Sequence, residues 1–497
     1  MREVHGQASV ETTTLVGTEP VPVEVQVDVA PGLPAFSIVG LGDTAVLEAR
    51  ERVRSALRTG GFRFPNARVV VNLAPGPLRK HGTGFDLPIA LGVLGATAQI
   101  PRDVWTGCRA VGELSLDAAV RPVPGMLAHA LGARRDHLPL LGPLASAHLA
   151  DGLPGLTFRG ISSLGMLLAE EHSMPVPATV PPRVTLPELG DVGGLKTARR
   201  ALEIAAAGGL NLLLIGPPGS GKTMLARRLG SILPPLEGEE RIETALVHSV
   251  AGLSEAPALN GQRPFRAPHH SASLAGLVGG GSPPRPGEVS LAHNGVLFLD
   301  EFPEFAPSAL QSLRQPMEDG YVTLVRAEGR LRFPARFTLV AAANPCPCGY
   351  LGDPVKDCRC TDTTIDRYRN RIGGPLMDRI DMAIGVERLD PSALVHAPCG
   401  ESSAAVRERV CAAREHMREA DRPNVATLSG GALLSACRLT PRTRQTLTDV
   451  GRQNHLSGRG ITRLMRVSRT IADLEGSSRV TNDHVMEALA FRREDLR

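Results

Sequence analysis

An eight-residue segment of this chain, Gly-Pro-Pro-Gly-Ser-Gly-Lys-Thr, has the residue types and spacing of a phosphate-binding loop. It follows the apolar run 212–215 and precedes a helix-prone run at 224–229, which is the context that this pattern requires. The glycines let backbone N–H groups turn toward a phosphate, Lys222 can reach the β- and γ-phosphates, and the Thr223 hydroxyl can hold Mg²⁺. The residues predicted to bind the nucleotide are Gly216, Pro217, Pro218, Gly219, Ser220, Gly221, Lys222 and Thr223.

Polar residues also follow two other apolar runs in this part of the chain. The run 295–299 ends in Asp300 and Glu301. Asp300 is expected to bind the water shell of Mg²⁺ and Glu301 to orient and polarise an attacking water, although such a pair alone could be a solvated strand end. The run 337–343 delivers Asn344 to the same edge, because open α/β sheets bind ligands beyond the carboxyl ends of their strands. Asn344 can sense the γ-phosphate or hold the water, or else form a turn before a proline.

Four of the eight cysteines lie close together: Cys346, Cys348, Cys358 and Cys360. Two C-x-C pairs can supply four thiolates to one tetrahedral Zn²⁺. In a reducing cytosol, such a cluster favours a metal site over a disulfide framework, and the alternative is four reduced thiols in an irregular loop. Because the cluster directly follows Asn344, a bound metal can fix that end of the strand.

A hairpin is predicted between the two acids and Asn344. Two alternating runs flank Glu328 and Gly329, a plausible turn. Arg326, Arg330 and Arg332 could then contact phosphates of DNA, a contact that is independent of sequence and sensitive to salt. The insert that contains Arg263, Arg266, His269 and His270 is expected to lie near this hairpin. Alternatively, these arginines only keep an exposed strand edge soluble.

The elements before the phosphate loop predict an α+β domain. Valine occupies every odd position from 21 to 29, which is typical of a half-buried strand. A helix is expected over 44–57, with Asp43 as its cap. A strand at 68–73 and a helix near 87–96 continue the alternation.

We divide the chain into an N-terminal α+β domain at 1–172, a proline-rich linker at 173–186, an α/β core at 187–390 and a helical domain at 391–497. The net charge is +4 over 497 residues, so any nucleic-acid contact must come from local basic patches. The sequence has no apolar run long enough to span a bilayer and no apolar segment at its start, which predicts a cytoplasmic protein without a membrane partner.

Three further segments carry a resemblance to a known family. The runs 263–271, 279–281 and 286–295 resemble the magnesium-chelatase-like branch of AAA+ ATPases. With the cysteine cluster and the N-terminal region included, the chain is most similar to the ComM/YifB family over essentially its whole length. This resemblance implies an AAA+ P-loop core with a C-terminal helical lid, preceded by an α+β domain of the Lon-protease/ribosomal-protein type.

The resemblance also implies a hexameric ring in which each subunit acts on its neighbour's ATP. Arg379 matches the family's finger motif and would reach the neighbouring nucleotide, unless it pairs locally with Asp378 or Asp381. Arg459, with Arg463 as the alternative, lies on the helix that resembles the one carrying a cis arginine sensor. In the related helicases, the hairpin projects into the central pore.

Lon-type proteases use a serine–lysine pair, but the comparable stretch 79–88 contains no serine. Asp86 lies near the expected place of the nucleophile and cannot form an acyl-enzyme. Thr83 is a conceivable substitute, yet we expect this domain to be non-proteolytic. Lys80 and His81 would bind phosphate or a neighbouring subunit instead.

The sequence therefore predicts an ATP hydrolase that uses ATP, Mg²⁺ and structural Zn²⁺. The expected function is a ring-shaped motor acting on branched or single-stranded DNA, with branch migration in recombination or natural transformation as its task. Two alternatives share the nucleotide site. One is a motor subunit that inserts Mg²⁺ into a porphyrin, and the other is a nucleotide-switched scaffold without DNA translocation.

Overall fold

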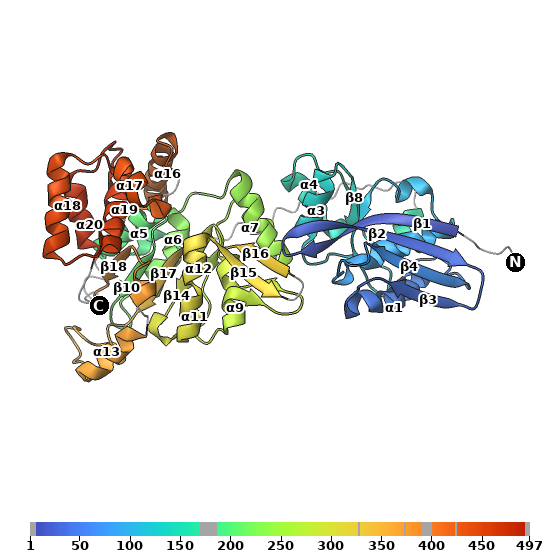
Figure 1. Ribbon diagram of the computed structural model, residues 1–497, viewed down its shortest axis with the longest axis horizontal. Coiled ribbons are helices and arrows are strands. Elements are labelled where there is room, and N and C mark those ends of the chain that lie inside the picture. Colours follow the sequence, from blue (N-terminus) through green and yellow to red (C-terminus); the bar gives the residue numbers. More distant parts are fainter. Residues whose placement is uncertain are drawn as a thin grey trace.

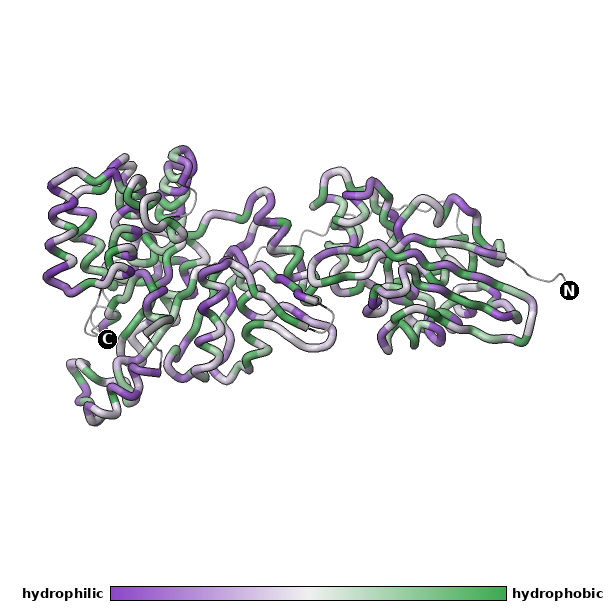
Figure 2. Tube along the Cα trace, in the orientation of Figure 1, coloured by the Kyte–Doolittle hydropathy of each residue, from purple (hydrophilic) through white to green (hydrophobic). Residues whose placement is uncertain are grey.

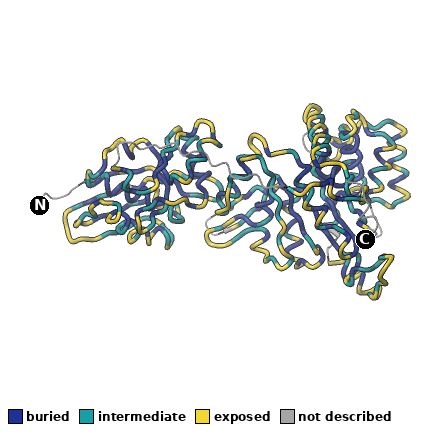
Figure 3. The backbone as a smooth tube through the Cα atoms, turned by 180° about the vertical axis from the view of Figure 1, so that it is seen from behind, coloured by how far each residue is buried: buried dark blue, intermediate teal, exposed yellow. Residues whose placement is uncertain are grey.

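The computed structural model describes residues 6–168, 186–326, 329–371, 374–388, 400–422 and 425–492. The molecule is elongated, with the N-terminal sheet at one end, a helical C-terminal part at the other and a second sheet between them (Figure 1). Hydrophobic residues concentrate along the strands, and hydrophilic residues along the outer helices (Figure 2). The strands of both sheets accordingly run through buried segments (Figure 3). The predicted linker at 173–186 lies outside the described residues except for its last position.

The N-terminal sheet has seven strands among the described residues, in the order β3-β4-β2-β1-β5-β8-β9. Its strands are β1 (Gly6–Val16), β2 (Glu19–Ala30), β3 (Ala35–Val39), β4 (Arg68–Ala74), β5 (Arg109–Ala110), β8 (Leu140–Pro143) and β9 (Phe158–Ile161). The odd-numbered valines of β2 from 23 to 29 are buried, as their alternation predicts. A separate small pair is formed by β6 (Glu113–Leu114) and β7 (Val120–Arg121).

The helices of this part are α1 (Thr44–Thr59), α2 (Asp86–Ala96), α3 (Met126–Arg135) and α4 (Leu149–Gly152). The predicted cap of α1 is confirmed, because the Asp43 carboxylate accepts a hydrogen bond of 3.0 Å from the Val46 N–H. Helix α2 is buried on all sides rather than on one stripe, which explains its almost wholly apolar sequence.

The second sheet is parallel, with strand order β11-β14-β17-β10-β18 in the described chain. Its strands are β10 (Leu212–Ile215), β11 (Phe265–Arg266), β14 (Gly295–Leu299), β17 (Phe337–Ala343) and β18 (Met382–Gly385). Ile215 pairs with Ala343, and Leu299 with Ala341, so the three strands predicted to carry the site end close together. The parallel register brings the residues that follow these strands to one edge.

Helices and hairpins surround this sheet. The helices are α5 (Lys196–Gly208), α6 (Lys222–Ile232), α7 (Gly238–Val250), α8 (Ala256–Leu259), α9 (Leu274–Val278), α10 (Glu288–Leu291), α11 (Pro307–Ser312), α12 (Arg314–Asp319), α13 (Asp362–Asn370) and α14 (Gly374–Met377). The hairpins are β12 (Gly279–Gly280) with β13 (Arg285–Pro286), and β15 (Tyr321–Arg326) with β16 (Gly329–Pro334). The predicted hairpin after the two acids is confirmed, and its tip at 327–328 lies outside the described residues.

The C-terminal part is helical, as its periodicity predicts. Its helices are α16 (Ser403–Glu419), α17 (Gly430–Cys437), α18 (Pro441–Gln453), α19 (Gly458–Leu474) and α20 (Asn482–Ala490). Leu464 of α19 and Val410 of α16 share one continuous hydrophobic core with Leu202 of α5. The helical part is therefore packed directly on the nucleotide sheet rather than tethered to it.

The N-terminal part contacts the central part through α7 and α8. The Leu127 N–H donates to Ser249 Oγ at 3.2 Å, and the Gly125 N–H donates to the Ser249 carbonyl at 2.7 Å. His148 and Glu255 approach to 3.1 Å. Nonpolar side chains from both parts form one shared cluster around these bonds.

Within the described ranges, every helix is too short or too polar to traverse a lipid bilayer.

Candidate active site

The phosphate-binding loop connects β10 to α6, as predicted. Gly219 and Gly221 have φ angles of 79° and 92°, a left-handed conformation that favours glycine. This conformation turns the backbone N–H groups of the loop around one point. The Ser220 hydroxyl is buried and has no hydrogen-bond partner among the described residues, as expected of a group that awaits a ligand.

Lys222 is buried and its ammonium group is held inside the loop. Its Nζ donates to the carbonyl oxygens of Gly216 at 2.7 Å and Pro217 at 2.9 Å. It also lies 3.2 Å from Asn344 Oδ1, which brings the predicted sensor residue to the loop. Burial lowers the pKa of Lys222, and the nearby carboxylate of Asp300 opposes this shift.

The two residues predicted to hold Mg²⁺ meet directly. Thr223 Oγ1 donates a hydrogen bond of 2.7 Å to Asp300 Oδ2. A hydroxyl from the phosphate loop and a carboxylate oxygen from the end of β14 are hard oxygen ligands of the kind that Mg²⁺ uses beside nucleotide phosphates. Together with the unpartnered Ser220 hydroxyl and the buried lysine, they fit a nucleotide with its magnesium ion.

Glu301 is half-exposed and has a φ angle of 51°, which is rare for a residue other than glycine. One of its oxygens, Oε2, lies 3.0 Å from Nδ1 of His270. His270 follows β11, which pairs in parallel with β14, so the residues after these two strands become neighbours. His270 belongs to the run 263–271 that carries the family resemblance, but no local sequence pattern predicts this contact.

A second group of predicted residues lies at the opposite end of the sheet. Arg379 forms a close ion pair with Glu318, and its pKa is lowered by burial and by the positive charges of Arg314 and Arg459. Arg379 precedes β18, and this strand runs parallel to β10. Arg379 is therefore at the amino end of the strands, away from the phosphate loop of its own chain.

Arg459 lies at this same edge. Its Nη1 donates a hydrogen bond of 2.9 Å to Oδ2 of Asp378, the residue that precedes Arg379 in the sequence. At this edge Arg459 lies beside the predicted trans finger and not beside the phosphate loop of its own chain. Arg463, the alternative, is buried and donates to the carbonyls of Met377 and Ile380 at 2.7 and 3.0 Å, which is a structural role.

The four cysteine sulfurs gather as predicted. One ligand atom from each lies within 4.8 Å of the others, and the Sγ atom of Cys346 is 3.4 Å from that of Cys348 and 3.6 Å from that of Cys358. Four thiolates at about 2.3 Å from a tetrahedral zinc ion would lie roughly 3.8 Å apart. Backbone N–H groups of Tyr350 and Arg359 lower the pKa of Cys348 to about 6, which favours the thiolate that a metal binds.

The β15–β16 hairpin has one apolar and one polar face. Val322 and Phe333 pair across the strands and are buried against the sheet. Arg332 is paired with a threonine of β15, Arg330 with an exposed valine, and the Arg332 guanidinium lies 4.6 Å from the Tyr321 ring centre. Directly opposed residues share a face, so Arg330 and Arg332 both point away from the core. The side chain of Arg326 lies outside the described residues.

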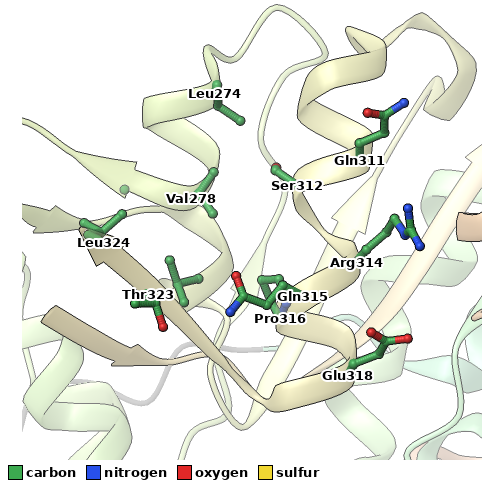
Figure 4. A pocket seen from close by; sticks show the side chains of 12 residues that line it. Leu274, Val278, Gln311, Ser312, Arg314, Gln315, Pro316, Glu318, Thr323 and Leu324 are labelled. Atoms are coloured by element: carbon green, nitrogen blue, oxygen red, sulfur yellow. The ribbon is translucent and has the colours of Figure 1, made fainter. Parts of the chain in front are cut away.

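A groove runs beside this hairpin, between α9, α12 and β15 (Figure 4). It is lined by apolar Leu274 and Val278 on one side and by Arg314 and Glu318 on the other. Since Glu318 is the partner of Arg379, the groove connects the hairpin to the edge that carries the arginines.

Two arginines of the segment expected to lie near DNA are already neutralised. Arg266 forms two hydrogen bonds of 2.6 Å with the carboxylate of Glu288. Arg263 donates to the carbonyls of Pro234 and Asn294 at 2.6 and 2.7 Å. Both side chains therefore stabilise the root of the insert, and the expectation that they face DNA is not supported.

The N-terminal part contains no assembled lysine-based nucleophile at the stretch compared with Lon proteases. Lys80 is fully buried and donates to the carbonyls of Leu73 and Pro75, so it is not placed to bind phosphate or a neighbour. Thr83 bonds to Glu113 instead of Lys80. Asp86 is buried and accepts two hydrogen bonds from one arginine side chain, of 2.7 and 2.9 Å.

A phosphate loop after β10, an acid pair after β14 and a polar residue after β17, the strand between those two, define a P-loop nucleotide-binding protein. Three family models match the chain: "Magnesium chelatase, subunit ChlI" over 188–394, "Subunit ChlI of Mg-chelatase" over 25–141 and "Magnesium chelatase, subunit ChlI C-terminal" over 400–492.

Relatives are similar over nearly the whole length. The chain is 42% identical over 503 residues to YifB of Salmonella typhimurium, covering 98% of this chain and 97% of that protein. It is 43% identical over 488 residues to Rv2897c of Mycobacterium tuberculosis, with 96% of each covered. It is 41% identical over 498 residues to the competence protein ComM of Haemophilus influenzae, covering 98% and 97%. The chain belongs to the ComM/YifB family of magnesium-chelatase-like AAA+ proteins.

A more distant similarity covers only part of the chain. The DNA replication licensing factor mcm6 of Dictyostelium discoideum is 26% identical over 180 residues, which is 36% of this chain and 17% of that protein.

Proposed function

We propose that this protein is an ATP hydrolase whose subunits form a hexameric ring and couple hydrolysis to the remodelling of branched DNA, as in recombination or natural transformation. The observation that carries the hydrolase is the convergence of Lys222, Thr223, Asp300 and Asn344 within hydrogen-bond distance, with Glu301 adjacent. A nucleotide-switched scaffold has no need of Glu301, since that carboxylate serves only the attack of water.

Each residue has a distinct task in the proposed reaction. Bound Mg²⁺ would neutralise charge on the β- and γ-phosphates. Lys222 exchanges its bonds to the loop carbonyls for bonds to phosphate oxygens, and Thr223 and Asp300 hold the metal. Glu301 accepts a hydrogen bond from the water whose oxygen attacks the γ-phosphorus, while the bond from that phosphorus to the β-phosphate oxygen breaks.

The arginines at the opposite edge support a site completed by a neighbouring subunit. Arg379 and Arg459 are too far along the sheet to serve their own phosphate loop, and their present partners are the carboxylates of Glu318 and Asp378. We infer that both act in trans. A neighbour's triphosphate would replace these carboxylates as the anionic partner, and each guanidinium would stabilise charge on the transferring group.

DNA as the substrate is supported by the hairpin and by two similarities. The outer face of β15–β16 combines Arg330 and Arg332 with Tyr321, a pairing of cations and an aromatic ring that suits phosphates and bases. ComM is named a competence protein and mcm6 a DNA replication factor. The chelatase alternative does not explain the arginines on the outer face of the hairpin.

The cysteine cluster is proposed to hold one structural zinc ion. The four sulfurs already approach the spacing of a ZnS₄ site. For the N-terminal part we keep the Lon-protease-like, non-proteolytic assignment and the boundaries at 172, 186 and 390 as predictions.

The proposal is tested by ATP hydrolysis with and without branched DNA. We compare the wild type with the double variant Arg330→Ala/Arg332→Ala and with a control, Arg442→Ala/Arg444→Ala, which removes two exposed charges from α18. DNA should stimulate the wild type and the control, and the hairpin variant should keep basal turnover but lose stimulation. Wild-type turnover that is indifferent to any DNA would contradict the DNA assignment.

A further inference from the structure

The loop that carries the cysteines begins against the phosphate loop. The Gly216 N–H donates to the carbonyl of Ala343 at 3.2 Å, so the end of β17 is bonded to the start of the phosphate loop. Asn344 follows and contacts Lys222, and Cys346 comes two residues later. Cys346 is fully buried. The first metal ligand is therefore fixed close to the nucleotide pocket.

The loop then touches the phosphate loop a second time. Gly349 has a φ angle of 86°, and a Cβ atom at this position would lie 2.7 Å from Cδ of Pro218. The backbone at Gly349 is thus in direct contact with the Pro218 ring. From the segment that follows β18, Arg388 donates to the Pro218 carbonyl at 3.3 Å and lies 3.7 Å from Asp353 of the cysteine loop. Pro218 is contacted by the cysteine loop and by a residue that the cysteine loop helps to place.

Little besides the cysteines holds this loop in place. The described chain has no helix or strand between the end of β17 and the start of α13, and no residue from 351 to 360 is buried as a whole, although the side chain of Asp353 is enclosed beside Arg388. A cation–π contact between Lys356 and Tyr350, at 4.4 Å, is exposed. A loop with so little buried surface needs another source of order. The sulfur cluster, which joins Cys358 to Cys348 at 3.6 Å, supplies it.

We propose that the cysteine loop is a metal-held clamp on the phosphate loop, so that the affinity for nucleotide depends on the metal bound by the four cysteines. This inference rests on the zinc assignment made above. With the metal bound, Gly349 stays against Pro218 and Asn344 stays beside Lys222. Without the metal, the segment 351–360 is no longer held and the contact with Pro218 loosens. Part of the free energy of nucleotide binding is then used to order the phosphate loop, so the measured affinity for nucleotide falls.

The first experiment compares Cys358→Ser with the wild type and with Cys411→Ser, a control cysteine on α16 of the helical part. Zinc content is measured by mass spectrometry, and the dissociation constant of a fluorescent ADP analogue by anisotropy. The wild type and the control should hold about one zinc ion per chain. Cys358→Ser should lose it and bind the analogue about tenfold more weakly, the usual scale for a lost supporting shell.

A second pair of variants tests the contact without touching a ligand. Gly349→Ala places a methyl group against Pro218, whereas Gly352→Ala has a similar φ angle of 76° and meets nothing within 4 Å. Both substitutions strain the backbone, so their difference isolates the contact. Gly349→Ala should keep its zinc and weaken ADP binding, and Gly352→Ala should keep both.

The outcomes separate the two claims. A wild type without zinc would overturn the zinc assignment and the clamp together. A second outcome is a zinc-free Cys358→Ser protein that melts at the same temperature as the Cys411→Ser control and binds ADP with wild-type affinity. This outcome would overturn the clamp and leave the zinc assignment standing. Equal ADP affinities for the two glycine variants would also contradict the clamp.

Discussion

Lys222 and Glu301 have separable tasks at the residue scale. Lys222 is buried in the loop proposed to receive phosphate, whereas Glu301 is half-exposed and is proposed to act only on the attacking water. Lys222→Ala should abolish nucleotide binding. Glu301→Gln should bind ATP normally and hydrolyse it about 100-fold more slowly or worse, the range for loss of a general base. Equilibrium binding and steady-state turnover measure the two effects.

The matched control for this comparison is Glu304→Gln, which removes a nearby acid that pairs with Arg371. It should change neither binding nor turnover. A Glu301→Gln protein with more than half the wild-type rate would contradict the assignment of the water-polarising group.

His270 gives the second residue-scale prediction. Its contact of 3.0 Å engages one carboxylate oxygen of Glu301, and the imidazole therefore competes with water for that oxygen. His270→Ala should therefore raise turnover in the absence of DNA several-fold with little change in KM. His269→Ala, which removes the adjacent ring tilted by 36° against that of His270, is the control. A fall in turnover like that of Glu301→Gln would show instead that the imidazole assists the carboxylate.

The buried His129 gives a prediction for one element, helix α3. It lies 2.5 Å from Thr13 Oγ1 of β1, and burial, with the charge of Arg109, lowers its pKa from 6.5 to about 3. The unfolded chain takes up a proton near pH 6.5 whereas the folded chain does not. Stability therefore falls as the pH decreases from 6.5 toward 3, by at most about 1.4 kcal/mol per pH unit from this residue.

Thermal unfolding between pH 7 and about pH 4.5 tests this linkage. The melting temperature of wild type should fall more steeply than that of His129→Gln, because the variant has no imidazole to protonate in the unfolded chain. His269→Gln, an exposed position, should follow the wild type. Parallel curves for wild type and His129→Gln would contradict the prediction.

Elements with strong local signals could be predicted from the sequence. β10, the phosphate loop and the cap of α1 are encoded within a few residues, and each was found where the spacing placed it. The contact of His270 with Glu301 depends on the pairing of β11 with β14. No local pattern gives that pairing, and so the sequence analysis missed it.

Charged side chains were the least predictable because their partners are distant in sequence. Arg263 and Arg266 read as available cations, yet they bond to carbonyls and to Glu288 at the root of the insert. Lys80 read as a surface cation and is buried on two carbonyls. The position of Arg459 follows from how the lid packs, which helical periodicity alone does not determine.

At the scale of the whole molecule, the nucleotide site is proposed to be shared between subunits. Lys222→Ala leaves Arg379 intact, and Arg379→Ala leaves the phosphate loop intact. Each variant alone should be inactive. An equal mixture assembled together should regain about a quarter of wild-type turnover, because a random ring brings an intact loop to an intact arginine at about a quarter of its interfaces. A mixture as inactive as either variant would contradict the trans assignment of Arg379.

The most direct test of the central claim is branch migration of a synthetic Holliday junction by the purified protein, followed by the release of labelled duplex products over time. We predict migration with ATP and Mg²⁺ by the wild type, and none by Glu301→Gln, which still binds ATP. Arg330→Ala/Arg332→Ala should hydrolyse ATP without migrating the junction. A wild type that hydrolyses ATP but leaves the junction intact, or a Glu301→Gln protein that migrates it, would contradict the coupling of this ATPase to DNA.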